Sequence, residues 1–197
     1  MLVLICFVAV GALAIWNPFN MTMTGLIPGS RVRLRPAAAE DAARFEEILS
    51  HPDIARWWAD AEEPVATQVS YLLDPDEGTT TYAIELDDVS GTVVGIELAF
   101  EEADPQYRHA GIDIAVHPDW QGRGLGTDAV RTLARYLIDV RGHHRLTIDP
   151  AADNARAIRT YEKVGFKPVG VMRRYERGKD GTYHDGLMMD LLAGEIR

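Results

Sequence analysis

The sequence predicts one mixed α/β domain, because segments whose apolar residues alternate are interleaved with segments whose apolar residues recur every three to four positions. Its 197 residues, 47% hydrophobic and 25% charged, are typical of one folded domain with a short appendage and exclude bulk disorder. The single cysteine, Cys6, excludes an intrachain disulfide and sites built from several cysteines. The formal charge of -10 argues against a nucleic-acid partner and suits a cationic ligand, although acidity also serves solubility.

Residues 1–29 form a separate apolar segment of uncertain role. Residues 2–16 are uncharged, but a run of about 15 residues is shorter than the roughly 20 that a membrane-spanning helix needs. No Lys or Arg precedes this run, as a secretory signal would require. Three interpretations stay open: a weak membrane anchor, a buried or oligomer-forming element, or sequence upstream of a start at Met21 or Met23. Membrane attachment is the less favoured of these, so we expect the domain at residues 30–197 to be cytoplasmic.

Seven segments with alternating apolar residues predict strands. They are residues 31–35, 79–86, 92–100, 110–117, 145–149, 169–176 and 182–192. The acidic turn at 87–91 predicts that the second and third strands form a hairpin. The glycine-containing turn at 178–181 predicts that the last two strands form another.

Four segments predict helices, at residues 36–50, 53–58, 127–140 and 154–164. Pro36 opens the first helix and His51-Pro52 ends it, because the residue before a proline disfavours the helical conformation. Gly165 ends the last helix as its C′ glycine. Along the chain the elements read β-α-α-β-β-β-α-β-α-β-β, with one βαβ unit in the middle.

The sharpest chemical signal is the glycine-rich loop Gln121-Gly122-Arg123-Gly124-Leu125-Gly126, between a predicted strand and a predicted helix. Successive backbone N–H groups in such a loop can point at one anion, and the start of the following helix adds positive charge. No Lys-Ser/Thr follows, which excludes a Walker loop, and the glycine spacing does not fit a dinucleotide fingerprint. We interpret the loop as a pyrophosphate cradle, with a merely flexible loop as the alternative.

Two motifs resemble the GNAT superfamily of acyl-CoA-dependent N-acetyltransferases over residues 30–192. The first, Q/R-x-x-G-x-G/A, is met by Gln121, Gly124 and Gly126. The second, an Asn that opens a helix followed by A-x-x-x-Y-x-x-x-G-F, is met by Asn154, Ala157, Tyr161, Gly165 and Phe166. The resemblance implies a GNAT-like fold: a central mixed, mostly antiparallel sheet with a splayed parallel pair at the acetyl-CoA site, flanked by about four helices.

A closer resemblance is to the aminoglycoside 6′-N-acetyltransferases. It rests on HPDIARWW at 51–58, GID at 111–113, and TIDP with N-A-R-A-I-R-x-Y-E-K-x-G-F from Thr147. It implies acetyl transfer from acetyl-CoA to the 6′-amine of a cationic antibiotic, by direct attack in a ternary complex, which would confer resistance. Two alternatives stay open: the same chemistry on a protein N-terminus, polyamine or siderophore-precursor amine, and a non-catalytic acyl-CoA-binding module. The loop at 101–109 departs from the pattern, which leaves the sugar contacts open.

The resemblance also implies residues that hold acetyl-CoA as co-substrate. Backbone groups of residues 114–116 bind it, an N–H near Val116 serves as oxyanion donor, and the loop surrounds the pyrophosphate. Asn154 either contacts the pantetheine arm or only caps its helix. The predicted cofactor-binding residues are Ile114, Ala115, Val116, Gln121, Gly122, Arg123, Gly124, Leu125, Gly126, Thr127 and Asn154.

Three residues are predicted to be catalytic. Tyr161 is the implied general acid for the departing thiolate, unless it is a packed helix tyrosine; an ordinary tyrosine pKa of about 10 keeps it protonated. Asp113 and Asp149 stand late in strands that flank the predicted cleft, so each can attract an ammonium group and take its proton. We expect Asp149 to be the base and Asp113 the binder, although the roles could be exchanged. Cys6 lies in the apolar run, which argues against a cysteine acyl-enzyme.

The acceptor, a cationic small-molecule amine, needs further contacts. Trp57 and Trp58 could stack on it or pack in the core, and the acidic residues that follow the second hairpin strand could hold amines or form a solvated rim. The predicted acceptor-binding residues are Trp57, Trp58, Tyr82, Glu97, Glu101, Asp104, Asp113, Asp149 and Asp185. The histidines show no metal-ligand spacing with nearby acids, so we predict no metal. A homodimer is left open.

Overall fold

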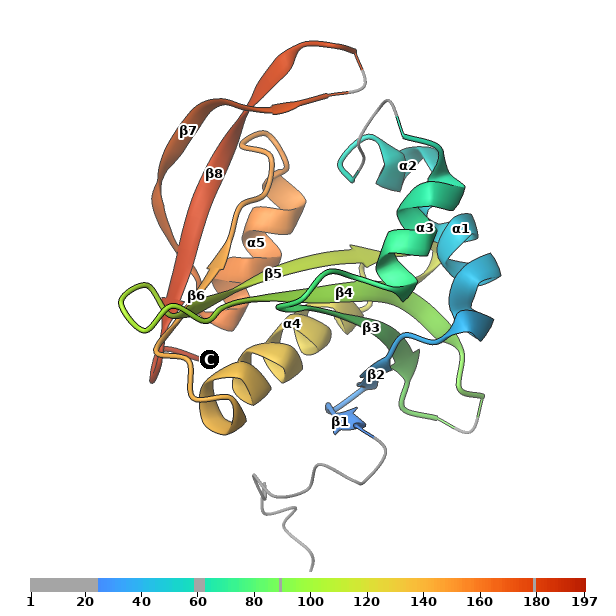
Figure 1. The fold of residues 1–197 in the computed structure, drawn as a ribbon, viewed down its shortest axis with the longest axis horizontal. Helices are drawn as coiled ribbons and strands as arrows, with labels where there is room; N and C mark the ends of the chain where they lie inside the picture. The colour runs from blue at the N-terminus through green and yellow to red at the C-terminus, as the bar shows by residue number, and fades with distance from the viewer. Residues whose placement is uncertain (1–24, 59–62, 89, 179) are drawn as a thin grey trace, which may run out of the picture.

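The computed structural model describes residues 25–58, 63–88, 90–178 and 180–197, which fold into one mixed sheet with helices on both faces (Figure 1). In this part of the chain the sheet has eight strands in the order β1-β2-β3-β4-β5-β6-β8-β7. The strands are β1 (Ile27–Pro28), β2 (Val32–Pro36), β3 (Thr79–Leu86), β4 (Val93–Glu102), β5 (His109–Val116), β6 (Arg145–Ile148), β7 (Lys167–Arg177) and β8 (Tyr183–Leu192). Neighbours are antiparallel except β5 and β6, which run parallel. The predicted fold class is therefore confirmed.

The helices of the described residues pack on two faces of this sheet. They are α1 (Ala42–Ser50), α2 (Pro52–Ala55), α3 (Val65–Leu73), α4 (Leu125–Arg135) and α5 (Ala155–Val164). On one face α1 and α3 place Phe45 and Val69 against Ile96 of β4. On the other face α4 and α5 place Leu133 and Val164 in a second apolar cluster. Because both faces are covered, β4 is buried along most of its length.

Two elements were not predicted from the sequence. The strand β1 has only two residues, which is too short for a visible alternation. The helix α3 contains Val65, Thr67 and Val69, whose branched side chains favour a strand more than a helix, and it buries only Val69 and Leu72. The helix predicted at 127–140 begins two residues earlier, and its last turn is the π-helical segment Tyr136–Val140.

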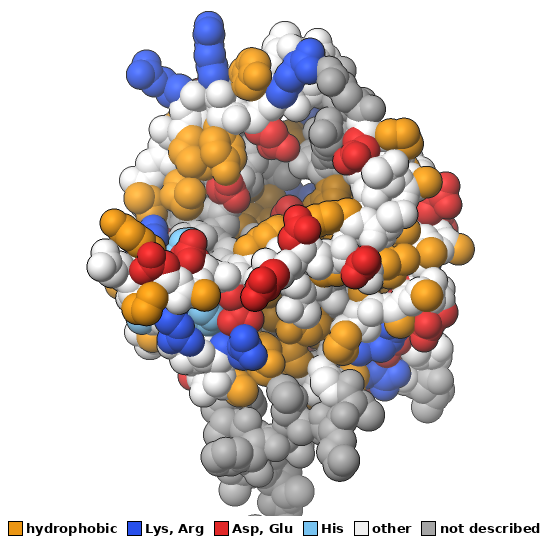
Figure 2. Space-filling view, viewed as in Figure 1, with side chains coloured by type: hydrophobic (Ala, Val, Ile, Leu, Met, Phe, Trp, Pro, Cys, Tyr) orange, Lys and Arg blue, Asp and Glu red, His pale blue; other side chains and the backbone are white. Residues whose placement is uncertain are grey.

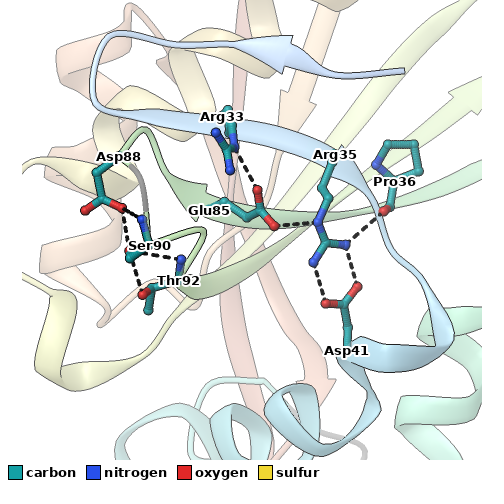
Figure 3. A network of polar contacts seen from close by, with 8 residues as sticks. All are labelled: Arg33, Arg35, Pro36, Asp41, Glu85, Asp88, Ser90 and Thr92. Atoms are coloured by element: carbon teal, nitrogen blue, oxygen red, sulfur yellow. Dashed lines mark hydrogen bonds and ion pairs between the residues drawn. The ribbon is translucent and has the colours of Figure 1, made fainter. Parts of the chain in front are cut away.

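A network of ion pairs joins β2, β3 and the start of α1 (Figure 3). The Glu85 carboxylate accepts from Nε of Arg33 at 2.8 Å and from Nε of Arg35 at 2.6 Å. The same Arg35 guanidinium donates two hydrogen bonds to Asp41, at 2.7 and 2.6 Å. Burial opposes ionisation of Asp41 and Glu85, but the arginines hold the pKa of both carboxyls below its usual value. These contacts help to fix the register of β2 against β3.

The start of the domain is attached to α4. One Asp128 carboxylate oxygen accepts the backbone N–H groups of Ser30, Arg31 and Val32, at 3.0, 2.7 and 3.2 Å. The preceding Gly29 is required by space, because a Cβ there would lie 2.6 Å from the Thr132 hydroxyl oxygen. The sheet thus includes β1, which lies just before the predicted boundary at residue 30.

The three interpretations of the apolar run at 2–16 concern residues outside the described ones. Among the helices that the structure describes, none has both the length and the apolar character that a bilayer crossing demands.

Candidate active site

The central feature of the site is the divergence of β5 from β6. The two strands pair only at Ala110 with Leu146 and at Gly111 with Thr147, while β5 stays paired with β4 as far as Val116. Backbone groups alternate sides along a strand, and the N–H of His117 donates to Val94 of β4 at 2.9 Å. The N–H of Val116 therefore points away from β4, into the opening between the diverging strands. This is the orientation expected of an oxyanion donor.

A cleft of about 710 Å³ occupies this opening. It is lined by residues of α2, β5, the glycine-rich loop, the segment 148–151, α5 and β7. In Figure 2 the same face is hollowed between the β7–β8 hairpin and the region of α2, with acidic side chains on both sides of the hollow. The cleft thus joins elements from most of the length of the domain.

The glycine-rich loop has the backbone of an anion cradle. Gly122 and Gly124 have φ angles of +73° and +80°, which only glycine adopts without strain. Left-handed Gly124 is followed by the first helical residue of α4, and this alternation turns successive N–H groups toward one point. Among the residues that the structure describes, no side chain caps the start of α4. The amides at this helix start are therefore available for an anionic group.

Cationic side chains stand beside this cradle. Arg156, Arg159 and Lys163 line the cleft from one face of α5, at a spacing of three and four residues. The Arg156 guanidinium donates to the Gln121 side-chain oxygen, so α5 contacts the loop directly. The Gln121 Nε2 group also donates to the Val116 carbonyl at 2.6 Å. We call residues 121–127 with these three cations the cradle side of the cleft.

A second group of residues that line the cleft carries carboxylates. Asp113 and Asp149 each stand two residues beyond the last β5–β6 pair, Gly111 with Thr147, so they face each other across the diverging strands. Glu176 of β7 lines the same region, together with Tyr175. We call Asp113, Asp149, Tyr175 and Glu176 the carboxylate side. The lining of the cleft thus includes a cationic group from α5 beside the loop and an acidic group from β5, the segment after β6 and β7.

Asp113 is adapted to exchange a proton near neutral pH. The Asp113 side chain is open to solvent within the cleft, but the walls of the cleft surround it with protein atoms. This burial, together with repulsion from Asp149 and Glu176, raises the pKa of Asp113 to about 7. A hydrogen bond of 2.9 Å from the Ile114 N–H opposes the rise. A pKa near the working pH suits a general base.

Tyr161 and Asn154 both reach the cleft from α5 and its start. Tyr161 is only 5% exposed and packs edge-on against Phe166, with ring centroids 6.2 Å apart. Burial, and then the nearby Asp113 and Glu97 carboxyls, raise the pKa of the Tyr161 hydroxyl, which therefore stays a proton donor. The Asn154 side-chain oxygen accepts the Ala157 N–H at 3.1 Å as a helix cap. Its amide NH₂ is not used by that bond, so the cap and a ligand contact are compatible.

The structure brings most of the predicted residues together. The three predicted catalytic residues, Asp113, Asp149 and Tyr161, line the cleft, as do Trp57 and Trp58. So do nine of the predicted cofactor residues: Ile114, Ala115, Val116, Gln121, Gly122, Gly124, Gly126, Thr127 and Asn154. The Leu125 side chain instead packs in the core, and the Arg123 guanidinium lies over the Trp120 ring at 4.8 Å. Neither of these two side chains lines the cleft.

Two predicted acceptor residues lie inside the protein. Tyr82 and Glu97 are cross-strand partners on β3 and β4, with exposures of 6% and 0%. Neither Glu97 oxygen has a hydrogen-bond partner among the described residues. Burial, and then the Asp113 charge, raise the pKa of Glu97 well above its usual value. The sequence predicts Glu97 as an acceptor contact, but helices cover both faces of β4, and Glu97 does not line the cleft.

Three further predicted acceptor residues lie outside the cleft. Glu101 bonds to His143 at 2.7 Å and to Arg141 at 3.0 Å, beside a separate hollow. Asp104 is an exposed residue of the loop between β4 and β5. Asp185 accepts the backbone N–H of Arg174 at 2.8 Å. These three residues were predicted from their charge alone. In the structure Glu101 and Asp185 bond to other groups of the protein, and Asp104 lies on an exposed loop.

Sequence reasoning missed Tyr175 and Glu176. A hydrogen bond from the Tyr175 hydroxyl to Asp149 raises the pKa of Tyr175 to about 12. Burial, and then repulsion from Asp149, raise the pKa of Glu176. Nothing in the local sequence marks either residue. By contrast, the missed cations of α5 share a helix face, which a count of basic residues at helical spacing could have found.

The His143 Nε2 atom lies 2.7 Å from the Glu101 carboxylate, and the His117 ring packs edge-on against His51 with ring centroids 5.5 Å apart. Within the residues described, no group of three or more His, Cys, Asp or Glu side chains is arranged to hold a metal ion.

A mixed sheet that splays at its one parallel pair, with an anion cradle beside the opening, is the architecture of the GNAT class of acetyltransferases. Residues 31–167 match the family model described as the acetyltransferase (GNAT) domain, and the chain belongs to this family. The resemblance drawn from the two sequence motifs is therefore confirmed.

Two relatives in sequence and one solved structure are similar to this chain. Spermidine N(1)-acetyltransferase of Escherichia coli K12 is 27% identical over 161 residues, covering 80% of this chain and 84% of the relative. Aminoglycoside N(6′)-acetyltransferase type 1 of Klebsiella pneumoniae is 32% identical over 158 residues, covering 72% and 76%. The structure of Vibrio cholerae spermidine N-acetyltransferase with CoA and spermine has a TM-score of 0.72 at 21% identity, covering 84% and 98%.

Proposed function

We propose that this GNAT protein transfers an acetyl group from acetyl-CoA to a primary amine of a polycationic small molecule, with the 6′-amine of an aminoglycoside as first candidate. The observation that carries the proposal is the division of one cleft into a cradle side and a carboxylate side. An anionic carrier and a cationic acceptor would each find opposite charge, and the two would meet between Val116 and Asp113. The relative of higher identity, from Klebsiella pneumoniae, is named for this acceptor.

The cradle side fits the phosphates of acetyl-CoA. The loop supplies converging N–H groups, and Arg156, Arg159 and Lys163 supply positive charge. When bound there, acetyl-CoA would supply an activated thioester carbonyl. The outward N–H of Val116 would donate to the carbonyl oxygen as negative charge develops on it.

The carboxylate side fits the handling of the amine. Asp149 would attract the ammonium group, and Asp113, with a pKa of about 7, would take its proton. This exchanges the roles first expected for the two aspartates, because burial and nearby carboxylates bring the pKa of Asp113 to about 7. After the neutral amine attacks the carbonyl, the C–S bond would break and Tyr161 would donate its proton to the sulfur that leaves. The nitrogen would lose its second proton in the same step, which restores Tyr161. The products are the amide, the thiol of CoA and the one proton held by Asp113.

A thiol-release assay with mass spectrometry tests the proposal. The enzyme is incubated with acetyl-CoA and, separately, kanamycin, tobramycin, spermidine, spermine and a peptide with a free N-terminus. We expect CoA release, with a gain of one acetyl group on kanamycin or tobramycin. Absence of acetylation of every polycation at high enzyme concentration would refute the proposal.

A second candidate acceptor is a linear polyamine. The specific observation in its favour is the Escherichia coli relative, whose match covers more of this chain than the aminoglycoside relative does. The ratio of kcat/KM for spermidine to that for tobramycin separates the two candidates. A peptide N-terminus is less suited, because its single charge would leave part of the carboxylate side unpaired.

A further inference from the structure

The edge strand β7 is distorted where it reaches the cleft. Met172 pairs with Gly186 and Glu176 pairs with His184, so four steps along β7 oppose two steps along β8. The extra residues form a bulge around Arg174, whose φ of +51° is the only positive value of a non-glycine residue in the part of the chain described. Bulges beside active sites commonly redirect a side chain, and backbone strain persists where the surroundings hold it.

Two features of β8 hold this bulge. The Asp185 carboxylate accepts the Arg174 N–H at 2.8 Å, which satisfies the amide that the bulge removes from the ladder. The Tyr175 ring lies across Gly186, where a Cβ would approach a ring carbon to 2.8 Å. Asp185 and Gly186 thus contact the bulge from β8 and fix the direction of the Tyr175 side chain.

The same part of β8 is bonded to the segment that follows Asp149. The Ala152 N–H donates to the Asp185 carbonyl, and the Leu187 N–H donates to the Pro150 carbonyl, both at 2.8 Å. The bulge and Asp149 are therefore held by one rigid frame. Within that frame Tyr175 and Asp149 line the same cleft, and the nearby Asp149 raises the pKa of the Tyr175 hydroxyl.

We propose that Tyr175 is a positioning residue for Asp149: the bulge clamped by Asp185 delivers the Tyr175 hydroxyl, which orients the Asp149 carboxylate toward the ammonium group of the acceptor. The inference rests on the proposed function, because it assigns that acceptor to the carboxylate side. It also gives Asp185 a different role from the acceptor contact expected from the sequence. Asp185 acts on the acceptor only through the backbone of Arg174 and the ring of Tyr175.

The first test removes the hydroxyl. In Tyr175→Phe we expect KM for the amine to rise about 10-fold, since hydrogen bonds to charged groups contribute at least that factor. KM for acetyl-CoA and kcat should change little, because the cradle side and Asp113 are untouched. Tyr183→Phe, on the exposed end of β8, is the matched control and should equal the wild type. An unchanged amine KM in Tyr175→Phe would overturn the inference.

The second test removes the clamp and then the strain. Asp185→Ala should raise the amine KM about 5-fold and speed hydrogen exchange of the Arg174 amide, because the strained turn loses its partner. Adding Arg174→Gly, which adopts a positive φ freely, should restore most of the amine KM. Asp180→Ala removes a comparable carboxylate, which accepts the Thr182 N–H, and should leave the amine KM unchanged. Failure of the rescue, or an equal effect of Asp180→Ala, would contradict the clamp.

Different results would contradict the proposed function and the role of Tyr175. If the wild type binds CoA but acetylates no amine, the proposed function fails and the role of Tyr175 fails with it. If the wild type is active and Tyr175→Phe matches it, only the inference about Tyr175 fails.

Discussion

The two sides of the cleft are built in different ways. On the cradle side one continuous stretch, residues 121–127, supplies main-chain N–H groups whose directions follow from two left-handed glycines. On the carboxylate side, Asp113, Asp149 and Glu176 come from β5, the end of β6 and β7, and meet only when the sheet is complete. A site made of backbone can be recognised from a short motif, whereas a site made of distant side chains depends on the whole fold. Substitutions should therefore affect the two sides separately.

The largest effect is expected on the carboxylate side. Asp113→Asn removes the group that takes the proton, and kcat/KM for the amine should fall by a factor of about 100 to 1,000. The affinity for CoA, measured by calorimetry, should stay within about twofold, because side chains distant from the cradle do not contact its ligand. A similar loss of CoA affinity would show that the two sides are not separate.

Tyr161 stands between the two sides, so its substitution should change the chemical step more than either binding step. Tyr161→Phe should lower kcat by a factor of about 100, as expected for loss of a general acid. The ring and its contact with Phe166 remain, so the fold should be preserved. Thiol release in a single turnover measures this, and an unchanged rate would assign Tyr161 to packing alone.

Gly124→Ala should affect the cradle side alone. The φ of +80° is unfavourable for alanine, so the loop should shift and the Kd for CoA should rise about 10-fold. Gly194→Ala is the matched control, because its φ of +94° carries similar strain and a Cβ there would meet nothing within 4 Å. Equal weakening in both variants would indicate a general loss of stability rather than damage to the cradle.

The smallest expected effect is a change in the pKa of Asp113, which the neighbouring carboxylates raise. Asp113 acts deprotonated, so kcat/KM for the amine should fall as the pH drops through its pKa of about 7. Glu176→Gln removes one of the charges that raise this pKa, so the acid limb should move to lower pH, by less than about one unit. Glu102→Gln, at the far end of β4, should leave the profile in place. A shift to higher pH in Glu176→Gln would contradict the assignment of the base.

The sequence predicted the glycine-rich loop, because converging amides require glycine at fixed positions and a helix directly after them, but it missed the three cations of α5. It also predicted Asp113 and Asp149 as site residues, since the first stands within and the second at the end of a strand of the predicted βαβ unit. It failed for Glu97, because no local pattern shows that β4 is covered on both faces. It failed for Tyr175 and Glu176, because they follow a bulge that the sequence does not reveal. The residue with the left-handed conformation in that bulge is Arg174, not a glycine that a sequence motif could show.

The most direct test of the divided cleft is an NMR titration of the uniformly ¹⁵N-labelled protein, with CoA added first and tobramycin second. CoA should move the amide signals of Gly122, Gly124 and Gly126 and leave those of Asp149 and Glu176 almost in place. Tobramycin should then move the second group and not the first. If CoA leaves the three glycine signals unmoved, or if both ligands move the same amides, the division of the cleft is wrong.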